Sequence, residues 1–278
     1  MIDVLLATSV GYREGEPGHE VLDTAFAARG VVSRWAVWDD PFVDWAGAGL
    51  VCVRSTWDYH QRLPDFLGWA GALGPKLLHG VEAFRWNTDK SYLLDLARYS
   101  RVPTVPTVIA DNPVDLRAAI GGFGTAVVKP RVGASGIGVV IVYDAESWLP
   151  VDAGPWVVQP LVESVQHEGE LSVFVFGGHP VSQVRKVASP QDIRVHSRYG
   201  GTSKAVTLSP DAALLAVDAV AATTEITGTQ ITYARVDLLH HDGRLVVSEV
   251  EITEPGLYLD LVPGNAARFV DAVLPHLG

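Results

Sequence analysis

The chain has 278 residues, enough for two or three closely packed lobes and too few for a large multidomain assembly. Its 21 basic and 32 acidic residues give a net charge of −11, which argues against nucleic acid as the main partner because the surface repels polyanions on average. A hydrophobic share of 48% with 19% charged residues excludes a disordered chain.

The single cysteine and the N-terminus predict the compartment. Cys52 lies in the apolar run GLVCV, so we expect a buried thiol and no internal disulfide. Residues 1–10 lack the basic start of a signal peptide, and no apolar run approaches the roughly 18 residues that cross a bilayer. We therefore expect a cytoplasmic protein without a membrane partner.

The N-terminal residues predict a small parallel-sheet lobe that ends near Phe84. Apolar runs with β propensity alternate with segments of helical periodicity, which is typical of βαβ units. Strands are expected at 2–8, 31–38, 49–55 and 76–79, and helices at 20–29 and 63–73.

The next residues predict a second lobe. A helix at 87–100, with Asn87 or Thr88 as N-cap, precedes Pro103 and Pro106, which force extended chain. Two strands joined by a glycine-rich turn then suggest a mobile flap. Strands are expected at 104–110, 125–130, 136–144 and 155–162, with a helix at 113–123.

The remaining residues predict two hairpins and two helices. The first hairpin, at 170–187, turns at Gly177 and Gly178, and Pro180 is expected to make its second strand an edge strand or to delay its start. A helix at 210–226, a hairpin at 231–252 and a helix at 265–277 follow. The predicted class is α/β with α+β lobes.

A lysine beside a glycine-rich turn predicts a phosphate site. Lys129 ends an apolar strand and opens KPRVGASGIGV, whose glycines allow backbone N–H groups to approach an anion. The spacing matches neither the P-loop nor the dinucleotide fingerprint, and an ordinary hairpin turn is the alternative.

Three carboxylates in the last hairpin predict a metal site. Glu249 and Glu251 share one strand face. A two-residue turn would point Asp237 away from them, whereas a three-residue loop of residues 241–243 would place all three on one face, and Gly243 favours the longer loop. Clustered carboxylates need a cation, and oxygen ligands suit Mg²⁺; solvated strand residues are the alternative.

Two further segments carry candidate substrate residues. Arg194, His196, Arg198 and Lys204 surround Gly200 and Gly201, a cationic loop that would close on a substrate carboxylate or on a transferring phosphate. The end of the strand at 49–55 is the edge at which open α/β sheets bind ligands. Its candidates are Arg54, Thr56, Asp58 and Tyr59.

The order of these motifs resembles the ATP-grasp superfamily, in the branch of glutathione synthetase and the ribosomal-protein glutamate ligases. The matching segments are NTDK, VVKPRVGASGIG, VVQPLVES, the arginine and glycine loop, RVDLL and SEVEITEP. Within that branch, RSTWDY, RWNTDKSYLLDLA and DIRVHSRYGG are similar to the ligases that form D-cycloserine.

The resemblance implies an ATP-grasp fold with a substrate lobe at 1–85, a flap lobe at 86–160 and a metal and phosphate lobe at 161–278. It implies a ligase of antibiotic biosynthesis that uses ATP and two Mg²⁺ to convert a small amino-acid-like carboxylate to an acylphosphate and then to an amide, within one molecule or between two. A small-molecule kinase and a non-catalytic ATP-binding regulator are the alternatives. Relatives form homodimers or homotetramers.

The resemblance also implies roles for matched residues. Lys90 and Lys129 would hold the α and β phosphates, and Lys186 and Arg194 would face the γ phosphate. The flap comprises Gly133, Ser135, Gly136 and Gly138; the adenine segment comprises Gln159, Leu161 and Val162; Glu170 is a nucleotide-proximal acid, with Glu163 or Glu168 as alternatives at the ribose; and Asp237, Glu249 and Glu251 are the magnesium ligands.

Two residues depart from the family pattern. Many relatives have asparagine where this chain has Glu251, which adds negative charge to the metal site. His196 likewise stands where peptide-forming relatives often have asparagine, and it would donate a hydrogen bond or relay a proton from the attacking nitrogen.

Overall fold

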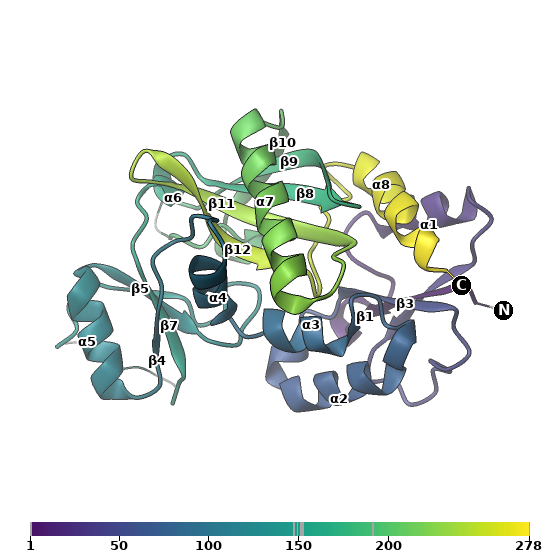
Figure 1. Ribbon diagram of the computed structural model, residues 1–278, viewed down its shortest axis with the longest axis horizontal. Helices are drawn as coiled ribbons and strands as arrows, with labels where there is room; N and C mark the ends of the chain where they lie inside the picture. Colours follow the sequence, from purple (N-terminus) through teal and green to yellow (C-terminus); the bar gives the residue numbers. More distant parts are fainter. Residues whose placement is uncertain (1, 147, 149, 151–152, 191, 278) are drawn as a thin grey trace.

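A computed structural model describes residues 2–146, 148, 150, 153–190 and 192–277, and this part of the chain forms three sheets (Figure 1). The sheets lie next to one another, and helices cover them on the outside. Among the described helices, none combines the length and apolar character that a bilayer crossing requires.

The first sheet is parallel, as predicted, with the order β2-β1-β3. Its side chains alternate between two cores: Val4 and Leu6 pack with α1 and α8, whereas Leu5 and Ala7 pack with α2. The elements are β1 (Val4–Thr8), α1 (His19–Ala27), β2 (Ser33–Val37), β3 (Leu50–Ser55) and α2 (Leu63–Leu73).

The strand expected at 76–79 is wrong. A short 3-10 helix, Gly74–Lys76, occupies its start, and only Leu77 makes a single parallel bridge with Val51. Pro75 lacks a backbone N–H, and a helix begins at Gly80, so too few residues remain for a strand.

The helix expected at 87–100 is divided into α3 (Gly80–Asn87) and α4 (Tyr92–Tyr99). Asn87 caps neither helix. Its side-chain amide donates to Val250 O and accepts from the N–H groups of Ile252 and Thr253, so it joins α3 to the end of the last strand.

The second sheet is antiparallel with the order β4-β7-β5-β6. Its helix α5 (Pro113–Phe123) has the predicted bounds, because Asn112 accepts from the N–H groups of Val114 and Asp115 and proline occupies the first position. The strands are β4 (Val108–Ala110), β5 (Ala126–Pro130), β6 (Val140–Val142) and β7 (Trp156–Pro160).

The third sheet is antiparallel with the order β10-β9-β8-β11-β12. One face packs on α4 and α7 in a shared core, and α8 lies beside α1 on the N-terminal sheet (Figure 1). The elements are α6 (Ser164–His167), β8 (Glu170–Phe176), β9 (His179–Val187), β10 (Thr202–Val206), α7 (Pro210–Thr227), β11 (Tyr233–His241), β12 (Arg244–Glu251) and α8 (Gly264–Val273).

The prediction from Pro180 is wrong, since β9 is an interior strand and begins at His179. The proline is tolerated because β10 pairs only with 183–187, and because the pairing with β8 shifts register between Phe174 and Val175, beside Pro180.

A buried ion pair connects the N-terminal sheet to the loop after β12. Arg54 is 0% exposed and donates to Glu16 Oε1 at 2.5 Å and to Pro255 O at 2.7 Å. Its guanidinium stacks 4.9 Å from the centre of the Phe269 ring. The other Glu16 oxygen accepts from Leu257 N at 2.7 Å, so the pair fixes the loop at two points.

Replacing Arg54 should be far more costly than replacing a surface arginine. Arg54→Met leaves the buried Glu16 carboxylate without its cation, and we expect the free energy of unfolding to fall by about 3–5 kcal/mol. Arg85 forms an exposed pair with Glu82, and Arg85→Met should cost less than about 1 kcal/mol. Urea unfolding followed by circular dichroism measures both variants. Equal losses of unfolding free energy in the two would contradict the assignment of Arg54 and Glu16 as a buried ion pair.

Candidate active site

One cavity of about 560 Å³ lies where the three sheets meet, a volume within the range of small-molecule sites. Most residues singled out from the sequence line it. They are Tyr59, Lys90, Lys129, Gly133, Ser135, Gly136, Gln159, Leu161, Val162, Glu170, Lys186, Arg194, His196, Gly201, Asp237, Glu249 and Glu251.

Several candidates do not line the cavity, among them Arg198 and Lys204 of the cationic loop. Arg54 and Thr56 are fully buried, and Arg54 binds Glu16 instead of facing the site. Asp58 accepts from Trp38 Nε1 at 3.0 Å. Gly138 packs on Pro130, and Gly200 ends a 3-10 helix with a positive φ of 81°.

The three carboxylates reach one face by a route that differs from the expected one. The turn has two residues, Asp242 and Gly243, both with positive φ, so the three-residue loop is wrong. Register instead shifts between Asp237 and Leu238, and Ser248 is the extra residue of a β-bulge. Asp237 therefore pairs with Glu249 instead of Ser248.

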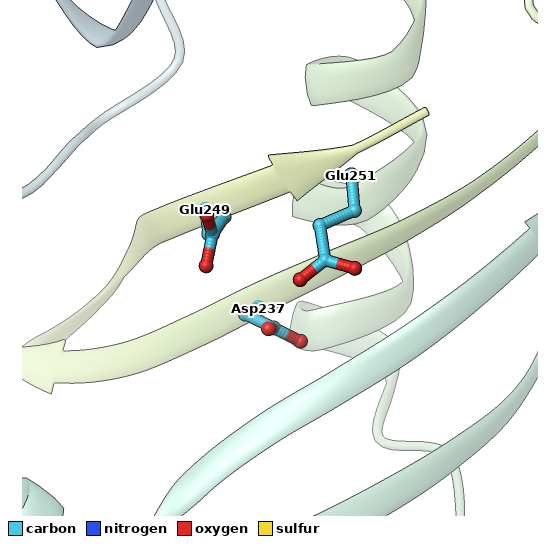
Figure 2. A group of neighbouring side chains, drawn as sticks. All are labelled: Asp237, Glu249 and Glu251. Atoms are coloured by element: carbon cyan, nitrogen blue, oxygen red, sulfur yellow. The ribbon is translucent and has the colours of Figure 1, made fainter. Parts of the chain in front are cut away.

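The bulge brings Asp237 of β11 together with Glu249 and Glu251 of β12, as Figure 2 shows. One oxygen from each carboxylate lies within 4.8 Å of the others. Ser248 Oγ donates to the main-chain oxygen of Asp237 at 3.0 Å, which holds the bulge in place. Clustered carboxylate oxygens are a donor set that suits Mg²⁺.

Cations from β9, from β11 and from the segment before α4 offset this negative charge. Lys90 pairs with Glu249, and Lys186 pairs with Glu170 and lies 3.0 Å from Asp237. Burial opposes ionisation of Asp237, but Arg235 and Lys186 outweigh it and hold the pKa of this carboxyl below its usual range.

Arg235 was not predicted as a site residue. It is 2.9 Å from Asp237 and also pairs with Glu251, so it neutralises the extra charge that Glu251 brings. The signal was present in the sequence, because Arg235 and Asp237 are two residues apart on one strand and share a face, as Glu249 and Glu251 do.

Lys129 is the cavity lysine for which the described residues provide no hydrogen-bond or ion-pair partner. Burial is the largest influence on it and lowers the pKa of its ammonium to about 8, against the attraction of Glu249. A cation in a desolvated position with no protein partner is suited to hold an anionic ligand.

The loop after β9 contacts the glycine-rich turn. Arg194 binds Asp192 at 2.6 Å and stacks 3.5 Å from the centre of the Tyr199 ring. A Cβ on Gly136 would lie 3.3 Å from Tyr199 and 3.6 Å from Arg194, so the flap packs against this loop. Gln191, which directly precedes the DIRVHSRYGG motif of this loop, lies outside the described residues.

The environment of His196 favours one of its two predicted roles. Its Nδ1 accepts from the N–H of Arg198 at 3.1 Å, and burial, followed by nearby cations, lowers the pKa of the ring. A neutral ring with Nδ1 as acceptor carries its proton on Nε2. His196 is therefore placed to donate a hydrogen bond, which favours this role over proton relay.

The segment expected to read adenine has several groups already engaged. Gln159 Nε2 donates to Thr107 Oγ1 at 2.9 Å, and Leu161 N donates to Thr125 O at 3.1 Å. Within the described part of the chain, the carbonyl of Leu161 and the N–H of Val162 have no backbone partner and are thus available to a base. Glu163 and Glu168, the ribose alternatives, do not line the cavity, whereas Glu170 does.

Comparison with known proteins identifies the family. Residues 87–259 match the RimK-like ATP-grasp domain, and residues 4–79 match the N-terminal domain of the D-cycloserine synthetase DcsG. The chain belongs to the RimK-like ATP-grasp family. It is 30% identical over 269 residues to the cycloserine biosynthesis protein DcsG of Streptomyces lavendulae, covering 89% of this chain and 90% of that protein.

Solved structures support the same assignment. A crystal structure of D-cycloserine synthetase DcsG superposes with a TM-score of 0.88 at 27% identity, covering 99% of each chain. The ATP-grasp ligase PsnB, in a complex with its minimal precursor, Mg and ADP, shares the fold with a TM-score of 0.65 at 15% identity, covering 100% of this chain and 99% of PsnB. The predicted ATP-grasp fold and the resemblance to D-cycloserine-forming ligases are confirmed, and the chain is an ATP-dependent ligase that forms C–N bonds.

Nucleotide binding should weaken above pH 8 because of Lys129. Below its pKa of about 8 the ammonium is charged and attracts phosphate; at higher pH the empty site loses that charge. We expect the affinity for AMPPNP with Mg²⁺ to fall by up to about tenfold per pH unit above pH 8. In Lys129→Arg the guanidinium stays charged, so its profile should be flat in calorimetric titrations. An identical decline of affinity in the wild type and in Lys129→Arg would contradict the role of the Lys129 ammonium.

Proposed function

We propose that this ligase activates the carboxylate of a small amino-acid-like molecule as an acylphosphate and closes an amide bond within the same molecule, as in the formation of D-cycloserine. The proposal is carried by the similarity to DcsG, which extends over the N-terminal lobe as well as the ATP-grasp lobes. This extent matters because residues of all these lobes line the cavity. The lobe division at 1–85, 86–160 and 161–278 and a cytoplasmic location are parts of the same proposal.

The phosphates would lie between the flap and the third sheet. Lys129 and Lys90 would hold the α and β phosphates, and the turn at 133–138 would cover them. Asp237, Glu249 and Glu251 offer enough oxygen atoms for two Mg²⁺ ions, which would offset phosphate charge when bound. Arg235 supports this arrangement, because its guanidinium pairs with Glu251 and offsets the negative charge of that carboxylate.

Lys186 and Arg194 would align the two anions that react. A substrate carboxylate oxygen attacks the γ-phosphorus, the bond to the β-phosphate oxygen breaks, and ADP leaves. Lys186 lies beside Asp237 in the cavity, while Arg194 would exchange Asp192 for the transferring phosphate. His196 would donate its Nε2–H to the same phosphoryl oxygens.

Ring closure then follows from the acylphosphate. The substrate nitrogen attacks the carbonyl carbon, the bond to the phosphate oxygen breaks, and the departing phosphate takes the proton from nitrogen. The flap keeps water from the acylphosphate through its contact with Arg194 and Tyr199.

The test uses the acid obtained by opening the amide bond of D-cycloserine, O-amino-D-serine, together with its N-carbamoyl derivative. We expect ADP, phosphate and ring product in equal amounts, and a hydroxamate when hydroxylamine traps the acylphosphate. A stable phosphorylated product without ring closure would indicate a kinase. ADP release without any hydroxamate or ring product would contradict the ligase mechanism.

Two charge deletions test the assigned roles. Lys129→Ala and Glu249→Gln should each lower kcat/KM by about 100-fold, because each removes charge that stabilises the transferring phosphate. Lys204→Ala and Glu225→Gln are matched controls, because both residues are exposed and lie outside the cavity lining. Steady-state ADP assays check all four variants, and equal activity of Glu249→Gln and Glu225→Gln would contradict the metal assignment.

A further inference from the structure

One part of the cavity lining contributes no lysine or arginine among the residues that the structure describes. It is formed by the N-terminal lobe and the loop that follows β12, and it is lined by aromatic and acidic side chains. Glu254 in this loop lines the cavity and is 8% exposed. Among the described residues, no hydrogen bond or ion pair involves its carboxylate, although its main-chain oxygen accepts from Trp57 Nε1 at 3.0 Å.

A second buried polar group faces the same space. Tyr59 lines the cavity and is 3% exposed, and its hydroxyl has no hydrogen-bond partner in the described part of the chain. After burial, the charge of Glu254 is the largest influence that raises the pKa of this hydroxyl, so the two groups lie near each other. Two polar groups on well-buried side chains are thus left for a ligand.

Aromatic rings form the walls around these groups. Tyr12 and Trp57 line the cavity in edge-to-face contact, with ring centres 4.6 Å apart. Tyr258, also in the lining, has a φ of 52°, a strained conformation for a residue other than glycine. The Arg54–Glu16 pair fixes the loop on both sides of Gly256, so the position of Glu254 is set before a ligand binds.

The charge of this part of the cavity lining determines what it accepts. Burial, followed by the charge of Glu251, raises the pKa of the Glu254 carboxyl to about 8, so the cations of the protein do not suffice to keep it ionised. A carboxylate beside aromatic rings attracts a compact cation, and binding such a cation favours loss of its proton. The cavity also contains the cations Lys90, Lys129, Lys186 and Arg194, which attract anions, and Lys90 is close enough for its charge to act on Glu254. A substrate that uses both kinds of group carries both charges.

We infer that Glu254, with the Tyr59 hydroxyl and the rings of Trp57 and Tyr12, binds a primary ammonium group of the substrate. This inference rests on the proposed function and adds a recognition site to it. The substrate is a zwitterion whose ammonium binds at Glu254 and whose carboxylate then points toward the γ-phosphate. Glu254 thereby selects amino acids over simple carboxylic acids.

Two acids that differ only in the ammonium group test the inference: O-amino-D-serine and 3-(aminooxy)propanoic acid. With the wild-type enzyme, we expect KM for the amino acid to be at least tenfold lower than for the acid without ammonium. Glu254→Gln should raise KM for the amino acid at least tenfold without raising KM for the other acid, so the preference disappears. Glu225→Gln should keep the wild-type preference.

Two control measurements distinguish loss of the ammonium site from loss of folding or of metal binding. Glu254→Gln should bind ADP with Mg²⁺ as the wild type does, by calorimetry. If this variant does not fold, Tyr59→Phe replaces it and should raise KM for the amino acid only. A preserved preference in the variant, equal KM increases for both acids, or weaker binding of ADP with Mg²⁺ would overturn the ammonium site and leave the ligase proposal intact. Failure of both acids to release ADP from the wild type would overturn the ligase proposal and this inference with it.

Discussion

Mutual neutralisation of buried charges is the constraint on which the site depends. The carboxylates of β11 and β12 face one cavity, and each lies against a cation: Lys186 of β9, Lys90 before α4, or Arg235 of β11 itself. An unpaired ion in such a position costs several kcal/mol, so the pairs hold the sheet and the segment before α4 in one arrangement. Among the described buried ionisable residues of the cavity, Lys129 and Glu254 fall outside this pairing, and they mark where a ligand of opposite charge would complete the balance.

The extent to which the sequence predicts the structure varies with the physical origin of each feature. Local signals were sufficient for α2 and α5. Both helices have helical periodicity and a proline in their first turn, and α5 is also capped by Asn112. The bulge at Ser248 has no such signal: it is stabilised by contacts of Ser248 with the neighbouring strand, and a turn rule based on Gly243 alone cannot detect it. The carboxylate cluster was nevertheless predicted, although by way of a three-residue loop that is wrong. One extra residue at the bulge changes the face of Asp237 relative to Glu249 just as one extra residue in the turn would have done.

The roles of the arginines show a second limit. Arg54 was predicted to contact substrate because it ends a parallel strand, yet its position at 0% exposure depends on Glu16, which is distant in the sequence and gave no signal of its own. Arg235 was overlooked although it shares a strand face with Asp237. Its pairing with Glu251 gives a physical reason why this chain tolerates glutamate where many relatives have a neutral amide.

The distribution of the cores divides the residues around the cavity between two separately packed parts of the chain. Side chains of the N-terminal sheet share one continuous core with β8, β11 and α8, and the Arg54–Glu16 pair crosses the same boundary. The sheet of β4 to β7 instead packs with α5 in a core of its own. The acidic residues of β11 and β12 and the N-terminal lobe therefore belong to sheets that are joined by buried packing, whereas Lys129 is contributed by a sheet with separate packing, so the nucleotide would be held from two independently packed parts of the chain.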